Sequence, residues 1–136
     1  LDGVKIGDAA QTVLYLGLDY KLSSKLSIDL DMMSYDDLHG RFGPLDSEFN
    51  SDNNRGSVKL PSFGTTDLGA TYRFNLLGYE TLARLNVNNL FDEEYISQSQ
   101  TNFHNDGGRT WNGVNVENQV YFGKGTTWNL GLNIKF

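Results

Sequence analysis

Residues 126–136 read TTWNLGLNIKF, and every second side chain in this stretch is apolar. The apolar series consists of Trp128, Leu130, Leu132, Ile134 and Phe136. A period of two places such a series on one face of a β-strand, whereas a helix would repeat every three or four residues. The stretch therefore predicts a strand with one apolar and one polar face.

The same alternation occurs in four earlier segments, at about residues 11–20, 25–33, 63–74 and 80–88. These segments predict an all-β chain folded as an antiparallel meander of about five strands. Strands of roughly nine to eleven residues have the length that a tilted strand needs to cross a bilayer. Strands of soluble proteins are typically shorter, at about five or six residues.

Charged side chains follow the polar parity throughout these five segments, as Asp29, Arg73 and Arg84 illustrate. A charge that faces lipid costs about 2–4 kcal/mol near the membrane midplane, so a lipid-facing series should contain none. A soluble β-sandwich also keeps charges off its inner face. Alternation alone therefore leaves a membrane barrel and a sandwich both open.

The connections between the predicted strands alternate in length. Residues 21–24 and 75–79 form short turns, whereas residues 34–59 and 89–125 form long polar connections. Alternate connections of a meander lie at the same end of the sheet, so the short turns share one end and the long loops the other. Outer-membrane barrels have this asymmetry, and sandwiches with Greek-key crossings seldom do.

Aromatic residues fall toward the two ends of the predicted strands. Those at the short-turn end, on the apolar face, are Tyr20, Tyr72, Phe74 and Phe136; those toward the long loops are Phe63, Tyr121, Phe122 and Trp128. Amphipathic rings are favoured at the two membrane interfaces, so two such groups around an aliphatic band favour the barrel.

Five strands cannot close a barrel, because the smallest bacterial barrels use about eight. An open edge in lipid leaves unpaired N–H and C=O groups, each costing several kcal/mol. We therefore expect the chain to be a fragment whose missing strands come from elsewhere in the protein.

Several function classes find no support in the sequence. The net charge of -6 disfavours nucleic acid as a partner, and there is no cysteine. His39 and His104 lie far apart, and residues 123–125 lack the rest of a phosphate loop. The acidic run 92–94 could suggest a cation site, but the segment Asp52-Asn53-Asn54 lacks the glycine and glutamate spacing of a calcium loop. We expect no catalytic residues, no metal site and no cofactor. The chain has neither a signal-peptide pattern nor a run of about eighteen apolar residues.

Three segments resemble the C-terminal end of TonB-dependent outer-membrane receptors. They are KLPSFG at 59–64 leading into DLGATYRF at 67–74, LNVNNLFD at 85–92 followed by Tyr95, and the ending from Val120 through Gly123-Lys124-Gly125 to Phe136. The first half of the chain fits this family by its strand pattern only. The asparagine-rich segment is the more specific feature, since many outer-membrane proteins end in an aromatic residue.

The resemblance implies a barrel of about 22 strands with an N-terminal plug, of which residues 1–136 would be the C-terminal portion without the plug. It implies residence in the outer membrane of a Gram-negative bacterium and uptake of a scarce nutrient: siderophore, vitamin, glycan or peptide. The implied partners are outer-membrane lipid, the other strands and plug of the same receptor, the TonB system through that plug, and the barrel-assembly machinery. A surface lipoprotein is a further partner that the resemblance allows. The assembly signal would be the alternating series that ends at Phe136.

The expected site residues fall into two groups. If substrate touches this part of the chain, the expected contacts lie in the second long connection, at His104, Arg109, Trp111 and Tyr121. Packing of these side chains within the loop is an equally good expectation. The inward-facing charges Asp67, Arg73 and Arg84 are expected to line the lumen or to brace the plug.

Two alternatives remain open from the sequence. One is a small outer-membrane barrel with a structural or adhesive role, which the strand pattern supports but the asparagine-rich segment does not. The other is a soluble β-sandwich that binds carbohydrate, which the mean hydropathy of -0.44 permits.

Overall fold

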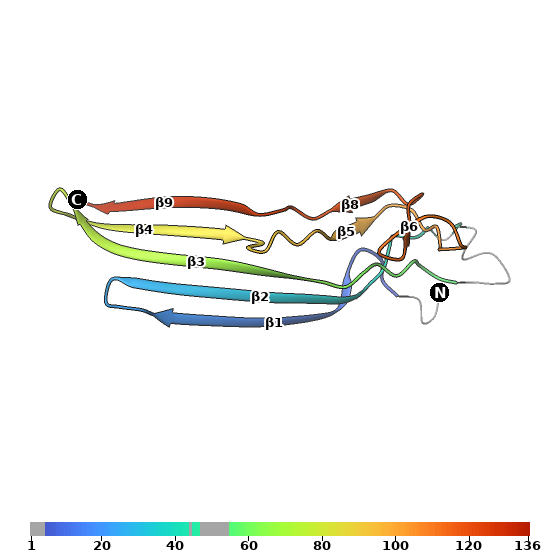
Figure 1. Ribbon diagram of the computed structural model, residues 1–136, viewed down its shortest axis with the longest axis horizontal. Helices are drawn as coiled ribbons and strands as arrows, with labels where there is room; N and C mark the ends of the chain where they lie inside the picture. Colours follow the sequence, from blue (N-terminus) through green and yellow to red (C-terminus); the bar gives the residue numbers. More distant parts are fainter. Residues whose placement is uncertain (1–4, 44, 47–54) are drawn as a thin grey trace. The chain divides into compact units, whose positions relative to one another are not determined.

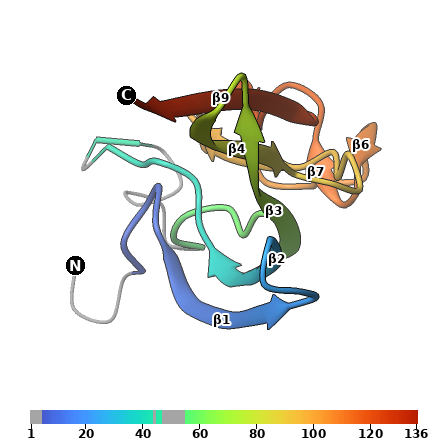
Figure 2. The ribbon, with the colours of Figure 1, turned by 90° about the vertical axis from the view of Figure 1, so that its left-hand side faces the viewer.

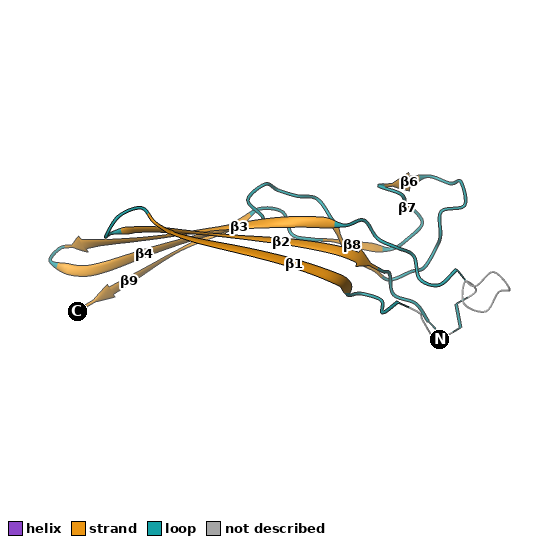
Figure 3. Cartoon of the chain, turned by 90° about the horizontal axis from the view of Figure 1, so that it is seen from below, coloured by secondary structure: helices purple, strands orange, loops and turns teal. Residues whose placement is uncertain are grey.

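A computed structural model describes residues 5–43, 45–46 and 55–136, and these residues form strands, turns and loops (Figure 3). The strands are β1 (Ala10–Lys21), β2 (Leu26–Leu38), β3 (Phe63–Leu76), β4 (Tyr79–Asn88), β5 (Ile96–Ser99), β6 (Thr110–Trp111), β7 (Val114–Asn115), β8 (Val120–Phe122) and β9 (Thr127–Lys135). No helix long and apolar enough to cross a membrane occurs among these residues.

The five long strands form one antiparallel sheet in the order β1-β2-β3-β4-β9 (Figure 1). This order confirms the predicted five-stranded meander. Seen from its end in Figure 2, the sheet follows a curve rather than a plane. Strands β5 and β8 pair with each other, as do β6 and β7.

The register of the sheet places like residues side by side. Ala70 of β3 lies opposite Leu85 of β4, which in turn lies opposite Leu130 of β9. On the other face, Asn86 of β4 lies opposite Asn129 of β9. Because a slip of one residue would exchange the two faces, the alternation fixes this register.

The β3–β4 hairpin closes with two residues, Leu77 and Gly78, whose φ angles are 52° and 92°. Positive φ at both central positions is the geometry of a type I′ turn, whose twist matches that of the flanking strands. Gly78 adopts this conformation without penalty, whereas Leu77 is an unusual choice there. The β1–β2 turn is held by Ser23, whose Oγ accepts hydrogen bonds from the N–H groups of Lys25 and Leu26.

The chain divides into two compact units. Unit 1 comprises Leu1–Leu14, Ser34–Phe63 and Glu94–Gly123; unit 2 comprises Tyr15–Met33, Gly64–Glu93 and Lys124–Phe136. Unit 1 has a small buried apolar core made of Leu38, Val58, Leu60, Ile96 and Val114.

Unit 2 leaves many apolar side chains exposed, chiefly on β1 and β9, while those on its central strands, such as Ile28, Leu68 and Leu85, are partly buried. Leu18 is 53%, Leu132 61% and Phe136 95% exposed, and no second layer covers them within the described part of the chain. Soluble sheets bury such a face against another layer. The apolar face of unit 2 is therefore a surface rather than a core.

Two expectations about the connections were wrong. β2 continues to Leu38 instead of ending near Met33, and Val58 and Leu60 are buried although they border a connection predicted to be polar. The connection from 89 to 125 contains four short strands. Strands of two to four residues are too short to show a period of two in the sequence.

Candidate functional site

A hydrogen-bonded ion pair crosses β3 on the polar face of unit 2. The Arg84 guanidinium, from β4, binds both carboxylate oxygens of Asp29, from β2, with 2.7 Å between Nη2 and Oδ2. Gly69 of β3 lies between them, and a Cβ there would collide with both side chains. A side chain at 69 would therefore displace the pair from its present position.

Polar contacts continue from Arg84 across the sheet. Its Nε donates to Oδ1 of Asn86 at 2.8 Å, and Nδ2 of Asn86 donates to Oδ1 of Asn129 at 3.0 Å. On the other side of the pair, the Tyr15 hydroxyl donates to Asp31 at 2.5 Å. The polar face therefore carries hydrogen-bonded side chains from β1, β2, β4 and β9.

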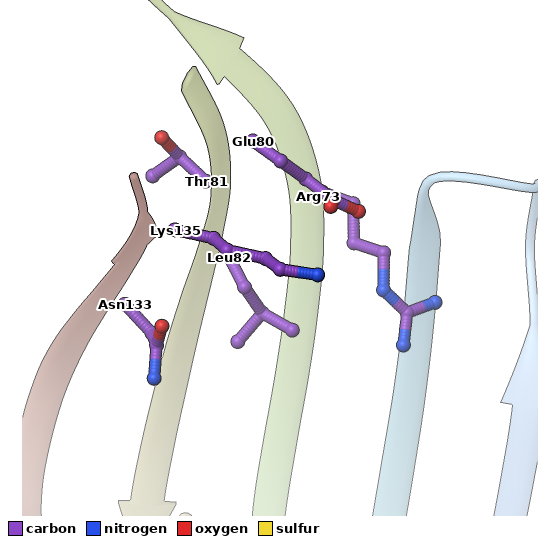
Figure 4. A pocket seen from close by; sticks show the side chains of 6 residues that line it. All are labelled: Arg73, Glu80, Thr81, Leu82, Asn133 and Lys135. Atoms are coloured by element: carbon purple, nitrogen blue, oxygen red, sulfur yellow. The ribbon is translucent and has the colours of Figure 1, made fainter.

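A hollow of about 290 Å³ lies on unit 2 at the end of the sheet that carries the β3–β4 hairpin (Figure 4). Its lining residues are Arg73, Glu80, Thr81, Leu82, Asn133 and Lys135. Figure 4 shows Glu80 and Lys135 extending from β4 and β9 to the side on which Arg73 lies. Three charged side chains thus surround one small space.

Asn89, buried at the end of β4, joins the segments on either side of it. Its Nδ2 donates to the carbonyl oxygens of Glu93 and Lys124, both at 3.0 Å, and its Oδ1 accepts from the Glu93 N–H at 2.9 Å. Its own N–H donates to Asp67 at 2.8 Å, and its carbonyl accepts from the Thr126 hydroxyl at 2.7 Å. With φ of 49°, the position also suits asparagine better than most residues.

A second contact in unit 2 closes the same turn. Asp92 Oδ1 accepts a hydrogen bond from the Thr126 N–H at 2.9 Å, and a Cβ at Gly125 would lie 2.7 Å from that oxygen. In unit 1, the Tyr95 ring lies on Gly123 and stacks on Phe63, with 3.9 Å between ring centroids. The three segments that carry the family resemblance thus contact one another. The contacts are made by Asn89, Asp92 and Tyr95, and by the chain at Gly123 and Gly125.

The four expected loop residues all lie in unit 1 but form no shared cluster among the contacts of the described residues. His104 Nε2 is 3.1 Å from the carbonyl oxygen of Gly56, and Trp111 packs against the apolar core and edge-on to Phe122. Arg109 and Tyr121 are exposed. Packing within the loop therefore accounts for His104 and Trp111.

Further polar contacts join the two long connections within unit 1. Asn102 donates to the Gly56 carbonyl at 3.0 Å and accepts from the Val58 N–H at 2.6 Å. Arg55 binds Asp106 with 2.5 Å between Nη1 and Oδ1, and this hydrogen bond holds the pKa of the Asp106 carboxyl below its usual value. Unit 1 is consequently a folded body with its own core, not a set of separate loops.

The three charged residues that were expected to face inward have different surroundings. Asp67 accepts from Asn89, Arg84 binds Asp29, and Arg73 lines the 290 Å³ hollow. Asp29 is identified in the sequence by its parity and Asn89 by the asparagine-rich segment, but neither residue is assigned a contact there. Asp29 had a signal in its parity, whereas Asn89 lies beyond the alternating stretch and its contacts with Glu93 and Lys124 arise only from the fold.

The expected assembly-signal series lies along β9 and past its end, and it is exposed. Its exposed apolar members are Trp128, Leu130, Leu132, Ile134 and Phe136. Phe136 packs edge-on against Tyr79 with ring centroids 5.4 Å apart, and Tyr72 stacks on Phe74 at 5.6 Å. The aromatic group expected at the short-turn end is therefore present, with Tyr79 as a further member.

Phe63 stacks with two tyrosine rings in unit 1. It has the parity of Asp67 in β3, and its ring lies between those of Tyr35 and Tyr95.

No group of three or more histidine, cysteine, aspartate or glutamate side chains placed to hold a metal ion occurs within residues 5–43, 45–46 and 55–136. Comparison with known proteins found that no family model, no curated protein and no solved structure matches the chain. The resemblance to TonB-dependent receptors thus stays a prediction from the sequence.

Proposed function

We propose that this chain is the C-terminal part of a TonB-dependent outer-membrane receptor, which takes up a scarce nutrient such as a siderophore, vitamin, glycan or peptide. The observation that carries the proposal is the exposed apolar face of unit 2, whose opposite face holds the charges. In this proposal the apolar face contacts lipid, and the Asp29–Arg84 network faces the lumen.

Three further features support the membrane assignment. The sheet strands are nine to fourteen residues long, aromatic rings gather at the short-turn end, and the sheet is curved (Figure 2). β1 and β9 each have one neighbour in the sheet, so each leaves an edge free to pair with another strand. These features favour a barrel over a β-sandwich, whose apolar face would need a second layer.

The receptor assignment depends on the segments 59–74, 85–95 and 120–136. Their contacts with one another explain why asparagine is used at 89 and glycine at 123 and 125. A small adhesive barrel would need the same alternation but has no evident use for this set of contacts.

Spin labels along β9 test the membrane part of the proposal. In the full-length protein in liposomes, labels at 130, 132 and 134 should be accessible to dissolved oxygen, and labels at 129, 131 and 133 should not. Equal accessibility at all six positions, or shielding of the even series, would contradict a lipid-facing sheet.

Uptake measurements test the receptor part. Cells lacking the protein should lose accumulation of one member of a panel of labelled iron chelates, cobalamins, glycans and peptides, and cells lacking TonB should show the same loss. Uptake that survives loss of TonB would instead indicate a passive barrel.

A further inference from the structure

The hollow on the polar face has the composition of a small binding site. Its volume of about 290 Å³ is near the lower limit of ligand pockets, which begin at about 300 Å³. Leu82 supplies an apolar surface and Asn133 an amide, while three charged side chains come from three neighbouring strands. A site of this size fits one or two side chains rather than a whole nutrient.

The three charged groups have no ion-pair partner among the described residues. Glu80 and Lys135 are directly opposite each other in the β4–β9 register, yet they form no ion pair within 4.0 Å. Arg84 and Asp29, on the same face, are paired. The charges of Arg73, Glu80 and Lys135 are therefore available to another molecule or segment.

We propose that this hollow, the Arg73–Lys135 site, receives the carboxylate side chain of an acidic protein segment. Arg73 offers the planar fork that pairs with a carboxylate, and Lys135 adds a second positive charge. Leu82 can contact the methylene groups of the entering side chain, and Asn133 can bind its peptide group. Two cations against one anion give the site a net charge of +1.

Glu80 determines which anion the site prefers. Its carboxylate reduces the net charge of the hollow to +1, which matches the single negative charge of a carboxylate. It can also accept hydrogen bonds from N–H groups of a peptide backbone, which a free phosphate lacks. The net charge of +1 and the hydrogen-bond acceptor at Glu80 together fit an acidic peptide segment, whereas inorganic phosphate offers no N–H group to Glu80.

This inference goes beyond the proposed function, because the site lies on the polar face of β3, β4 and β9 whatever completes the sheet. It also has a separate test. If the protein is not a receptor, the site can still bind an acidic segment; if the site is empty, the receptor proposal is unaffected.

Zero-length cross-linking with a carbodiimide tests the site in the full-length protein in its native membrane. The reagent joins a lysine amine to a carboxylate that contacts it. We expect mass spectrometry to find Lys135 joined to an aspartate or glutamate outside the hollow, and the product should persist in the Glu80→Gln variant. Lys124, which does not line the hollow, is the comparison lysine. Lys135 joined only to Glu80, or to nothing, overturns the proposal.

Two further arms define the ligand chemistry. Arg73→Ala should lower the yield of the Lys135 product about tenfold, the effect of losing one charge-assisted contact. Inorganic phosphate should lower the yield no more than sodium chloride of equal ionic strength. A specific loss in phosphate would identify a phosphate site and overturn the carboxylate assignment.

Discussion

Gly69 shows how one residue without a side chain permits a charged contact between two strands that are not neighbours. The Arg84 guanidinium reaches Asp29 by crossing β3 over Gly69, where a Cβ would lie 2.2 Å from atoms of both side chains. Both side chains are partly exposed, at 35% and 24%, so the contact is a half-buried pair. The net stabilisation from such a pair depends on its hydrogen-bond geometry more than on its charges alone.

Gly69→Val should therefore break the Asp29–Arg84 contact and lower the free energy of unfolding by about 1–3 kcal/mol. Denaturant unfolding of the full-length protein in detergent measures the change. Gly131→Val is the matched control, because a Cβ at 131 meets only the Arg84 carbonyl oxygen at 4.0 Å. Equal loss in both variants would show that strand propensity, not the pair, is responsible.

Asn89 makes three side-chain hydrogen bonds at a position with positive φ. Asn89→Ala should lower the free energy of unfolding by about 2–4 kcal/mol, since each neutral hydrogen bond contributes about 0.5–1.5 kcal/mol. Asn89→Gly keeps the backbone conformation and should lose less. Hydrogen exchange at the Glu93 N–H, whose acceptor is Asn89 Oδ1, should rise in both variants; an unchanged rate would exclude the role assigned to Asn89.

Asp106 gives a pH-dependent contact in unit 1. Its folded-state pKa is lowered by the hydrogen bond from Arg55, so the contact contributes fully above the ordinary carboxyl value of about 3.9 and is lost as the pH falls through the lowered pKa. Titration of the Asp106 side-chain carbon by NMR should give a midpoint below that ordinary value. Arg55→Ala should return the midpoint to it, whereas a midpoint unaffected by Arg55→Ala would refute the contact.

At the scale of elements, the β3–β4 hairpin contains one residue that its geometry does not favour. A type I′ turn usually has asparagine or aspartate at its first central position, where Leu77 has φ of 52° and is 91% exposed. Leu77→Asn should raise the free energy of unfolding by about 1 kcal/mol. Thermal unfolding in detergent measures this, with Leu22→Asn in the other short turn as the control. An unchanged or lower stability for Leu77→Asn would indicate that the exposed leucine has contacts outside the described residues.

The two faces of β9 should tolerate different substitutions. Leu132→Lys places a charge on the apolar face, at a cost of about 2–4 kcal/mol if that face lies near the membrane midplane. Asn133→Ala removes one amide from the opposite face and should have little effect. The amount of folded, protease-resistant protein in the outer membrane distinguishes the two. Normal assembly of Leu132→Lys would contradict lipid contact at this position.

At the scale of the whole molecule, the sheet has an exposed apolar face and two free strand edges. Both need to be covered by groups outside the sheet. The structure provides a small core in unit 1 and none in unit 2 within the described residues. Both unpaired edges and exposed apolar faces promote association in water. The proposed barrel supplies strands for the edges and lipid for the face.

The sequence by itself determined the strands of the long sheet, their order and the parity of their two faces. A period of two is a local property that can be recognised within a segment of about eleven residues. The Asp29–Arg84 contact over Gly69, the bonds of Asn89, the core of unit 1 and the Arg73–Lys135 site were decided only by the tertiary structure. Each includes contacts between residues far apart in the sequence, such as 55 positions for Asp29 and Arg84 and 35 for Asn89 and Lys124. No local pattern records which distant side chain will lie beside another. Alternation specifies which face a residue occupies; register and turn geometry specify its neighbour.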